Sequence, residues 1–449
     1  MAGKEFVSIS DVIAQANKTF KKELAQVGIA DLVVKRIPYT SPRLNYSTYG
    51  GVPRGRLTMF AGKESSGKTS TALDVIKNAQ HLFEQEYLEE VSSLNKEIKA
   101  LTKIIESKDA AKGKKDQAKK QLPELQERLK YVETVGVKVC VYFDAEGTLD
   151  GEWAAKLGVN VDNVVLFRLH TQTAEQFLDQ VVAAAKSPQV GLIVVDSLAV
   201  LIPQLTHDES LEQKSMGGNA KVITDFVNKI HPVINELDTA VILIQQARDD
   251  FKNPYAEFAI PGGNALKLAC SLIQTFQKGS FVDEAGEEKK KSYETPKGNI
   301  VWARIQKTKI CKPDRRVGFY TIDYDYGIDI VSDILPLAVE FGVIKKAGSW
   351  FSILNPDTGE ILVDVNGEPI KFQGEATMRA FLREDEAAFQ FIYEYVNNKV
   401  SEKENAPDLT ISEELDKAAI AQANGEEIAV PIPRMETAAE ELEAEKAIV

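Results

Sequence analysis

Residues 60–73, FAGKESSGKTSTAL, place a turn rich in glycine and hydroxyl groups between an apolar segment and a run of helix-forming residues. Gly62, Gly67, Lys68 and Thr69 match the pattern G-x-x-x-x-G-K-[ST], whose backbone N–H groups surround phosphates at the start of a helix. In this pattern the lysine neutralises the outer phosphates and the next hydroxyl ligates Mg²⁺. The stretch therefore predicts a nucleotide-binding loop.

The segments around this loop predict the fold class. RLTMFAG (56–62), VKVCVYFDAEG (137–147), VGLIVVDSLAV (190–200) and TAVILIQQAR (239–248) are apolar, β-branched runs separated by helical stretches. Strands that are apolar on both faces and alternate with helices are typical of a parallel sheet covered by helices on both sides. We therefore expect an α/β fold with a mostly parallel central sheet.

Two carboxylates follow the ends of these strands. Asp196 ends GLIVVD and is the expected second holder of Mg²⁺, together with Thr69. Glu146 lies two residues beyond Asp144, at the edge where α/β sheets place their ligands, and is a candidate general base. A surface carboxylate is the alternative interpretation of Glu146, and a polar strand cap is the alternative for Asp196.

Composition limits the class of protein. The 449 residues are 44% hydrophobic, and no early stretch joins a basic start to an apolar run or approaches the length of a membrane span. We expect a soluble, cytoplasmic protein with no membrane partner. The three cysteines are far apart and do not suggest a zinc site. The net charge of −13 includes −9 from residues 401–449, so the body is nearly balanced.

A charged interruption separates the first two strands, over residues 82–136. Its apolar residues recur at alternating spacings of four and three, as in coiled-coil seams: Tyr87, Val91, Leu94, Ile98, Leu101 and Ile105, then Ala118, Leu122, Leu125, Leu129 and Val132. Between the two series lies a lysine-rich stretch, SKDAAKGKKDQ. The pattern predicts an antiparallel helical hairpin with a basic tip, in which Pro123 kinks the second helix or marks its start. The hairpin is either a solvated structural spur or an arm that contacts DNA or an unknown partner.

The expected organisation has four parts. An N-terminal helix over residues 8–28 and a short strand form an arm (1–40), and the core with its inserted hairpin follows (41–331). A small α+β domain (332–400) and an acidic tail (401–449) complete the chain. The tail is either regulatory or a disordered, solubilising extension.

At the level of motifs the sequence resembles the RecA family of recombination ATPases. The stretches that carry the resemblance, in matching order, are ESSGKT, FDAEGTLDGEWAAKLGV, VGLIVVDSLAVLIP, SMGGNAK, QQAR, PGGNALK and QKTKI. The resemblance covers most of residues 1–400, and GGNALK with QKTKI is more specific than the phosphate loop alone. It implies a RecA-like core, an oligomerisation arm, and ATP and Mg²⁺ as cofactors.

The resemblance also implies roles for particular residues. Glu146 would be the general base, and Gln246 would sense the γ-phosphate. Lys307 and Lys309 would reach the γ-phosphate of a neighbouring subunit. The ATP-binding residues would be Gly62, Lys63, Glu64, Ser65, Ser66, Gly67, Lys68, Thr69, Ser70, Asp150 and Trp153.

Two long segments, 204–221 and 248–263, would bind single-stranded DNA through apolar surface and backbone donors. The candidate DNA-binding residues implied by the resemblance are Met216, Lys221, Arg248, Phe251, Gly262, Gly263 and Arg304. The expected activity is that of a DNA-dependent ATPase and recombinase, which forms helical filaments on single-stranded DNA and pairs it with homologous duplex DNA. A hexameric RecA-fold helicase or translocase is the alternative.

The sequence departs from the family pattern in several places. The hairpin segment is absent from ordinary bacterial RecA, Lys63 stands where proline is usual, and Gly147 replaces a histidine. Gln277 and Lys278 occupy the place of an arginine pair in the second DNA site. The departures suggest a divergent, bacteriophage-encoded member of the family.

Overall fold

A computed structural model describes residues 34–108, 110–204, 218–247, 263–284, 286–290, 293–364 and 367–401, together with residues 14, 15 and 18. The chain divides into two units, Met1–Lys35 and Arg36–Val449. The predicted N-terminal helix lies almost wholly outside the described residues, as do segments 205–217 and 248–262 and the acidic tail beyond residue 401. Those predictions stay predictions.

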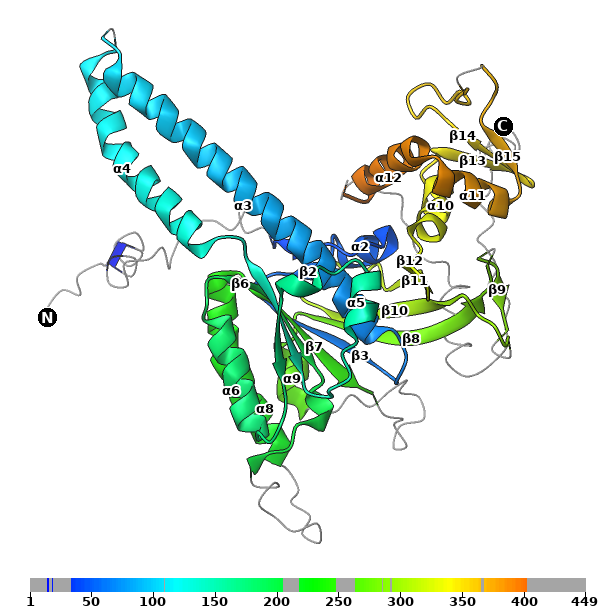
Figure 1. Ribbon diagram of the computed structural model, residues 1–449, viewed down its shortest axis with the longest axis horizontal. Coiled ribbons are helices and arrows are strands. Elements are labelled where there is room, and N and C mark those ends of the chain that lie inside the picture. The colour runs from blue at the N-terminus through cyan, green and yellow to red at the C-terminus, as the bar shows by residue number, and fades with distance from the viewer. Residues whose placement is uncertain are drawn as a thin grey trace, which may run out of the picture. The chain divides into compact units, whose positions relative to one another are not determined.

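A ten-stranded sheet forms the centre of the second unit, in the order β12, β11, β10, β8, β3, β7, β6, β4, β5, with β9 paired to β8 (Figure 1). The bounds are β3 Leu57–Gly62, β4 Val139–Asp144, β5 Val164–Arg168, β6 Val190–Asp196, β7 Ala240–Gln246, β8 Leu272–Val282, β9 Glu288–Lys289, β10 Gly298–Thr308, β11 Val317–Asp323 and β12 Gly327–Ile328. From β8 to β5 all neighbouring strands are parallel. The predicted α/β architecture with a mostly parallel sheet is confirmed.

The rest of the sheet is antiparallel and was not predicted. β10 pairs antiparallel with β8 and with β11, and β12 and β9 extend this half further. A separate short pair, β1 (Arg36–Ile37) with β2 (Val52–Pro53), is also antiparallel. β8 continues well beyond the end of β3, since Gly62 pairs with Phe276 while β8 runs on to Val282. The antiparallel half therefore flanks the loop that follows β3.

Helices cover both faces of the sheet because alternate residues of each central strand point to opposite sides. Met59 and Ile193 pack in one hydrophobic cluster with helices α6 (Ala174–Ala185), α8 (Gly218–Leu237) and α9 (Gly263–Ala269). Their neighbours Phe60 and Val194 pack in a second cluster with helices α2 (Pro42–Thr48), α3 (Lys68–Glu106) and α5 (Gly151–Lys156). Two short 3₁₀ helices, η1 (Val161–Asn163) and η2 (Leu198–Val200), complete this part.

Residues 82–136 form two helices that contact one another along their lengths (Figure 1). The first is not a separate element, because α3 runs without interruption from the phosphate loop at Lys68 to Glu106. After a short turn, α4 (Lys112–Val135) returns toward β4. The inserted segment therefore extends the helix that follows the phosphate loop. Pro123 lies inside α4 and does not mark its start.

None of the seam positions in the two helices is exposed, and Leu94, Ala118 and Val132 are buried. An ion pair between Arg128 and Glu90, at 2.7 Å, joins the two helices near their middle. No helix in the described ranges is both long enough and apolar enough to cross a membrane.

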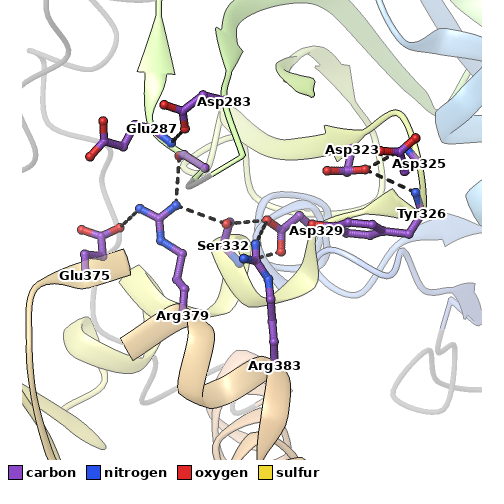
Figure 2. A network of polar contacts seen from close by, with 11 residues as sticks. Asp283, Glu287, Asp323, Asp325, Tyr326, Asp329, Ser332, Glu375, Arg379 and Arg383 are labelled. Atoms are coloured by element: carbon purple, nitrogen blue, oxygen red, sulfur yellow. Dashed lines mark hydrogen bonds and ion pairs between the residues drawn. The ribbon is translucent and has the colours of Figure 1, made fainter. Parts of the chain in front are cut away.

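The C-terminal part has its own hydrophobic cluster, to which Tyr46 of α2 also belongs. Its elements are α10 (Ile330–Glu340), the antiparallel strands β13 (Ile344–Ala347), β14 (Trp350–Ile353) and β15 (Lys371–Gln373), and helices α11 (Glu375–Glu384) and α12 (Glu386–Ser401). Figure 2 shows the polar contacts that join this part to the core. Arg379 donates to the Gly286 carbonyl at 2.9 Å, and Arg383 pairs at 2.7 Å with Asp329, which caps α10.

Candidate nucleotide-binding site

The loop after β3 requires glycine at two positions. A Cβ on Gly62 would lie 2.4 Å from the Phe276 carbonyl oxygen of neighbouring strand β8. Gly67 has a φ of +95°, which disfavours other residues, and a Cβ there would lie 2.8 Å from Cγ1 of Val301 on β10. Because α3 begins at Lys68, the loop presents the start of a long helix beside the carboxyl end of β3. Such an arrangement favours anions.

A cavity of about 250 Å³ opens beside this loop. Seven of the predicted nucleotide-binding residues line it: Ser65, Ser66, Gly67, Lys68, Thr69, Ser70 and Trp153. The other lining residues were not predicted as ligands: Lys278, Asn299, Val301, Ile322 and Tyr324. Gly62, Lys63, Glu64 and Asp150 are not among the lining residues. Lys278, which occupies the place of an arginine in the second DNA site of the family pattern, lines the cavity because β8 continues past the end of β3.

Lys68 lies folded against its own loop. Its ammonium group donates to the backbone carbonyls of Gly62 at 3.1 Å and Lys63 at 2.7 Å. Burial lowers the pKa of Lys68, while the charges of Asp196 and Glu146 oppose that change. The cation is thus held at the cavity wall, within the loop that would surround a phosphate.

Asp196 lies beside the first turn of α3. Its Oδ2 accepts hydrogen bonds from the Thr69 hydroxyl at 2.8 Å and the Tyr142 hydroxyl at 2.7 Å. Asp196 as a whole residue is only 4% exposed. Burial raises its pKa, and the hydrogen bonds from Tyr142 and Thr69 lower it. Tyr142 was missed, because a tyrosine inside an apolar strand gives no sequence signal for a carboxylate partner.

The Thr69 hydroxyl and the Asp196 carboxylate fit Mg²⁺. Mg²⁺ prefers oxygen ligands and usually keeps several waters, so one or two protein ligands beside phosphate oxygens suffice. In the described part of the chain, no group of three or more His, Cys, Asp or Glu side chains could hold a metal without such help.

Glu146 and Gln246 come together at the ends of β4 and β7. Glu146 Oε1 accepts a hydrogen bond from Gln246 Nε2 at 3.0 Å and another from the Ser197 hydroxyl at 2.5 Å. Asp144 shapes the turn that carries Glu146, because its Oδ1 accepts the Gly147 N–H at 2.7 Å. The predicted base and sensor are therefore in direct contact, and Ser197 is a partner that the sequence did not indicate.

Asp150 and Trp153 lie at the start of α5. The Asp150 carboxylate caps this helix by accepting the N–H groups of Glu152 at 2.9 Å and Trp153 at 3.3 Å. Trp153 Nε1 donates to the Ser70 hydroxyl at 3.2 Å, which fixes the indole against α3. The structure thus places Trp153 at the cavity and Asp150 behind it.

Lys307 and Lys309 are not at this cavity. Lys307 pairs with Ile273 on β8, and Ile273 pairs with Met59 inside β3. The two lysines therefore lie toward the sheet edge formed by the strand ends opposite the phosphate loop. There Lys309 donates to the Leu268 carbonyl at 2.6 Å, and Lys307 donates to the same carbonyl at 3.0 Å and to that of Lys267. Burial, followed by the charge of Lys309, lowers the pKa of Lys307.

The predicted DNA-binding residues fall in two groups. Met216, Arg248, Phe251 and Gly262 lie outside the described residues. Lys221 is exposed on the first turn of α8, Gly263 is the first residue of α9, and Arg304 is partly buried on β10.

The strand order and the loop at the end of β3 define an α/β protein of the P-loop class. The family model for the RecA N-terminal domain matches residues 126–329. The RecA protein of Aquifex pyrophilus is 31% identical over 324 residues, which cover 71% of this chain and 74% of the relative. The chain belongs to the RecA family.

Two further relatives cover more of the chain. The RecA protein of Chlorobium chlorochromatii is 29% identical over 368 residues, 82% of each chain. A mitochondrial DNA repair protein, the recA homolog of Dictyostelium discoideum, is 29% identical over 386 residues, 84% of this chain and 69% of its own. At these identities the chain is a divergent member of the family.

Proposed function

We propose that this protein is an ATP-hydrolysing recombinase, which assembles as a helical filament on single-stranded DNA and pairs it with homologous duplex DNA. Family membership supports the recombination and repair role. The observation that carries the filament is the position of Lys307 and Lys309, on the sheet edge opposite the phosphate loop of the same chain. A head-to-tail assembly can bring that edge to the cavity of the next subunit.

The cavity supports binding of ATP with Mg²⁺. The loop N–H groups and Lys68 would hold the phosphates, while Thr69 and Asp196 would hold the metal. Trp153 and Tyr324 both line the cavity and offer aromatic surface to a base. When bound, ATP would supply the phosphoryl group and Mg²⁺ would neutralise part of its charge, while transfer to water also needs an oriented nucleophile.

Glu146 orients the attacking water and accepts its proton in this proposal. The carboxylate is held in place through Oε1, by the Ser197 hydroxyl and the Gln246 amide. Gln246 ends β7, two residues before segment 248–262, where we expect a DNA contact. A change at the phosphate that moves Gln246 would therefore act on the DNA-binding segment and on the base together.

Mixing two inactive variants tests the shared site. Lys68→Ala removes the phosphate ligand, and Lys307→Ala with Lys309→Ala removes the lysines from the opposite edge. Each preparation alone should lose ATP turnover stimulated by single-stranded DNA. In a random equimolar filament about a quarter of the sites combine an intact loop with intact lysines, so the mixture should regain about a quarter of wild-type turnover.

Lys312→Ala is the matched control, because this exposed lysine lies just beyond the pair; it should retain full turnover. Electron microscopy with single-stranded DNA and a slowly hydrolysed ATP analogue gives the second measurement, alongside a strand-exchange assay. No recovery in the mixture would refute a site shared between neighbouring subunits. Closed rings, or no exchange products, would refute the filament recombinase.

A further inference from the structure

The far end of the α3–α4 pair carries a concentration of positive charge. Residues 103–120, here named the lysine tip, hold seven lysines against three carboxylates. The lysines are Lys103, Lys108, Lys112, Lys114, Lys115, Lys119 and Lys120. All are exposed except Lys115, which is partly buried. The tip is therefore a solvent-facing cationic surface.

Packing and folding do not account for this charge. Arg128 is paired with Glu90 nearer the sheet, but none of the tip lysines forms an ion pair with any described residue. The first turn of α4 includes Lys112, Lys114 and Lys115 and has no acidic residue, although carboxylates are favoured there and lysines are not. Mutual repulsion at the tip costs stability, and a polyanionic partner would remove that cost.

The position of the tip suits a large partner. Phe83 is the last residue of α3 in the hydrophobic cluster of the sheet, and the helix ends at Glu106. At about 1.5 Å per residue, the tip is held about 35 Å beyond that contact. Figure 1 shows the two helices leading away from the sheet. The tip therefore reaches well clear of the nucleotide cavity.

The side chains at the lysine tip favour duplex DNA over single-stranded DNA as the partner. Residues 101–125 contain no Phe, Tyr, Trp or His. Binding to single strands commonly uses aromatic side chains on which bases stack, whereas lysines alone suit the phosphates of a duplex. Duplex DNA also carries about one negative charge per 1.7 Å of helix axis, which matches a compact cluster of cations.

We propose that the lysine tip binds the phosphate backbone of duplex DNA without sequence preference, at a site separate from the segments expected to hold the single strand. The biological use rests on the proposed function, since a recombinase must capture a duplex. The binding itself can be measured independently of that function.

Two double variants of the full-length protein test the site. Lys112→Gln with Lys114→Gln neutralises the tip, and Lys96→Gln with Lys130→Gln removes the same charge from exposed positions nearer the sheet. Glutamine preserves helix propensity. Binding to a labelled duplex of about 30 base pairs is followed by fluorescence anisotropy without nucleotide, over a range of salt concentrations.

The tip variant should bind the duplex about tenfold more weakly than wild type at moderate salt, with a salt dependence shallower by up to about two released ions. The variant with changes nearer the sheet should bind within about twofold of wild type. Turnover of ATP stimulated by single-stranded DNA should be unchanged in both variants. A failure of the recombinase proposal would therefore appear in turnover and strand exchange, whereas a failure of the tip proposal would appear in duplex binding.

Equal duplex affinity of the two variants would overturn the proposal. So would a greater loss for an unstructured single strand than for the duplex. The acidic tail is the rival occupant, and neutralising Glu413, Glu414, Glu426 and Glu427 to glutamine tests it. If the two double variants no longer differ in that background, the lysines bind the tail and not DNA.

Discussion

A close contact between β6 and α3 permits a quantitative test of the packing under the phosphate-loop helix. Gly191 lies on β6, and a Cβ placed there would lie 2.4 Å from Cζ and 2.5 Å from Cε2 of Phe83. Favourable carbon contacts are about 3.5–4.0 Å, so the overlap exceeds about 1 Å. Phe83 is 1% exposed and cannot swing into solvent without losing its contacts. Gly191→Ala should therefore destabilise the fold by about 1–3 kcal/mol, the usual cost of overpacking.

The same overlap predicts a rescue. Phe83→Leu alone should cost about 1–2 kcal/mol through lost packing, but it shortens the side chain that meets the new methyl group. The double variant should be about as stable as Phe83→Leu alone, which gives a coupling energy of about 1–3 kcal/mol between the two positions. Urea denaturation followed by circular dichroism measures all three variants.

Gly113→Ala is the control, because Gly113 lies in α4 and a Cβ added to it would meet nothing within 4 Å. This change should not lower stability, since alanine favours helix over glycine. Strictly additive losses for Gly191→Ala and Phe83→Leu would refute the steric reasoning, because the predicted overlap involves only these two side chains.

Three more predictions concern the site and the C-terminal part. Tyr142→Phe removes a hydrogen bond to the Asp196 carboxylate and should raise the Mg²⁺ concentration needed for ATP turnover about tenfold; Tyr320→Phe, which loses a hydroxyl contact to a threonine, should leave it unchanged. Glu146→Gln should reduce turnover by about 10² to 10⁴ while ATP binding persists; normal turnover would contradict the role of the base. Burial raises the pKa of Asp333 from 3.8 to about 6. The folded state holds the Asp333 proton more tightly than the unfolded state does. The protonated carboxyl therefore stabilises the fold fully below the unfolded pKa, and this stabilisation disappears as the pH rises through about 6. Denaturation at several pH values should show that loss, up to about 3 kcal/mol, in wild type and not in Asp333→Asn.

The sequence predicted the parallel half of the sheet because those strands are buried on both faces and read as continuous apolar runs. The antiparallel half was not foreseen. Its strand β10 has four consecutive apolar residues, 300–303, between Asn299 and Arg304. Composition alone does not reveal that this strand runs antiparallel or which strand it pairs with. The apolar spacing of the hairpin was predicted, but the junction between the hairpin and the core helix was not. Helix-forming residues run unbroken from Lys68, and no proline or glycine marks where the core helix would end.

The site was predictable where chemistry requires a particular residue type in a fixed pattern, as in the phosphate loop. Glu146 and Gln246 were each inferred separately, and only the fold brings them to 3.0 Å. Tyr142, Ser197 and Tyr324 were missed because tertiary contacts between different strands and turns give them their partners. Asp150 was predicted to bind ATP; its observed contacts are those of a helix cap that positions Trp153, and the contact with ATP stays a prediction.

Because α3 runs unbroken from the phosphate loop into the hairpin, a small rotation of the helix at the loop produces a large displacement at its far end. The first residue of the helix, Lys68, belongs to the phosphate loop, and the last, Glu106, lies 38 residues further along the same helix. At about 1.5 Å per residue, a tilt of only about 5° at the loop displaces the far end by about 5 Å. A spectroscopic label near Lys108 would convert a small rearrangement around phosphate into a displacement large enough to measure.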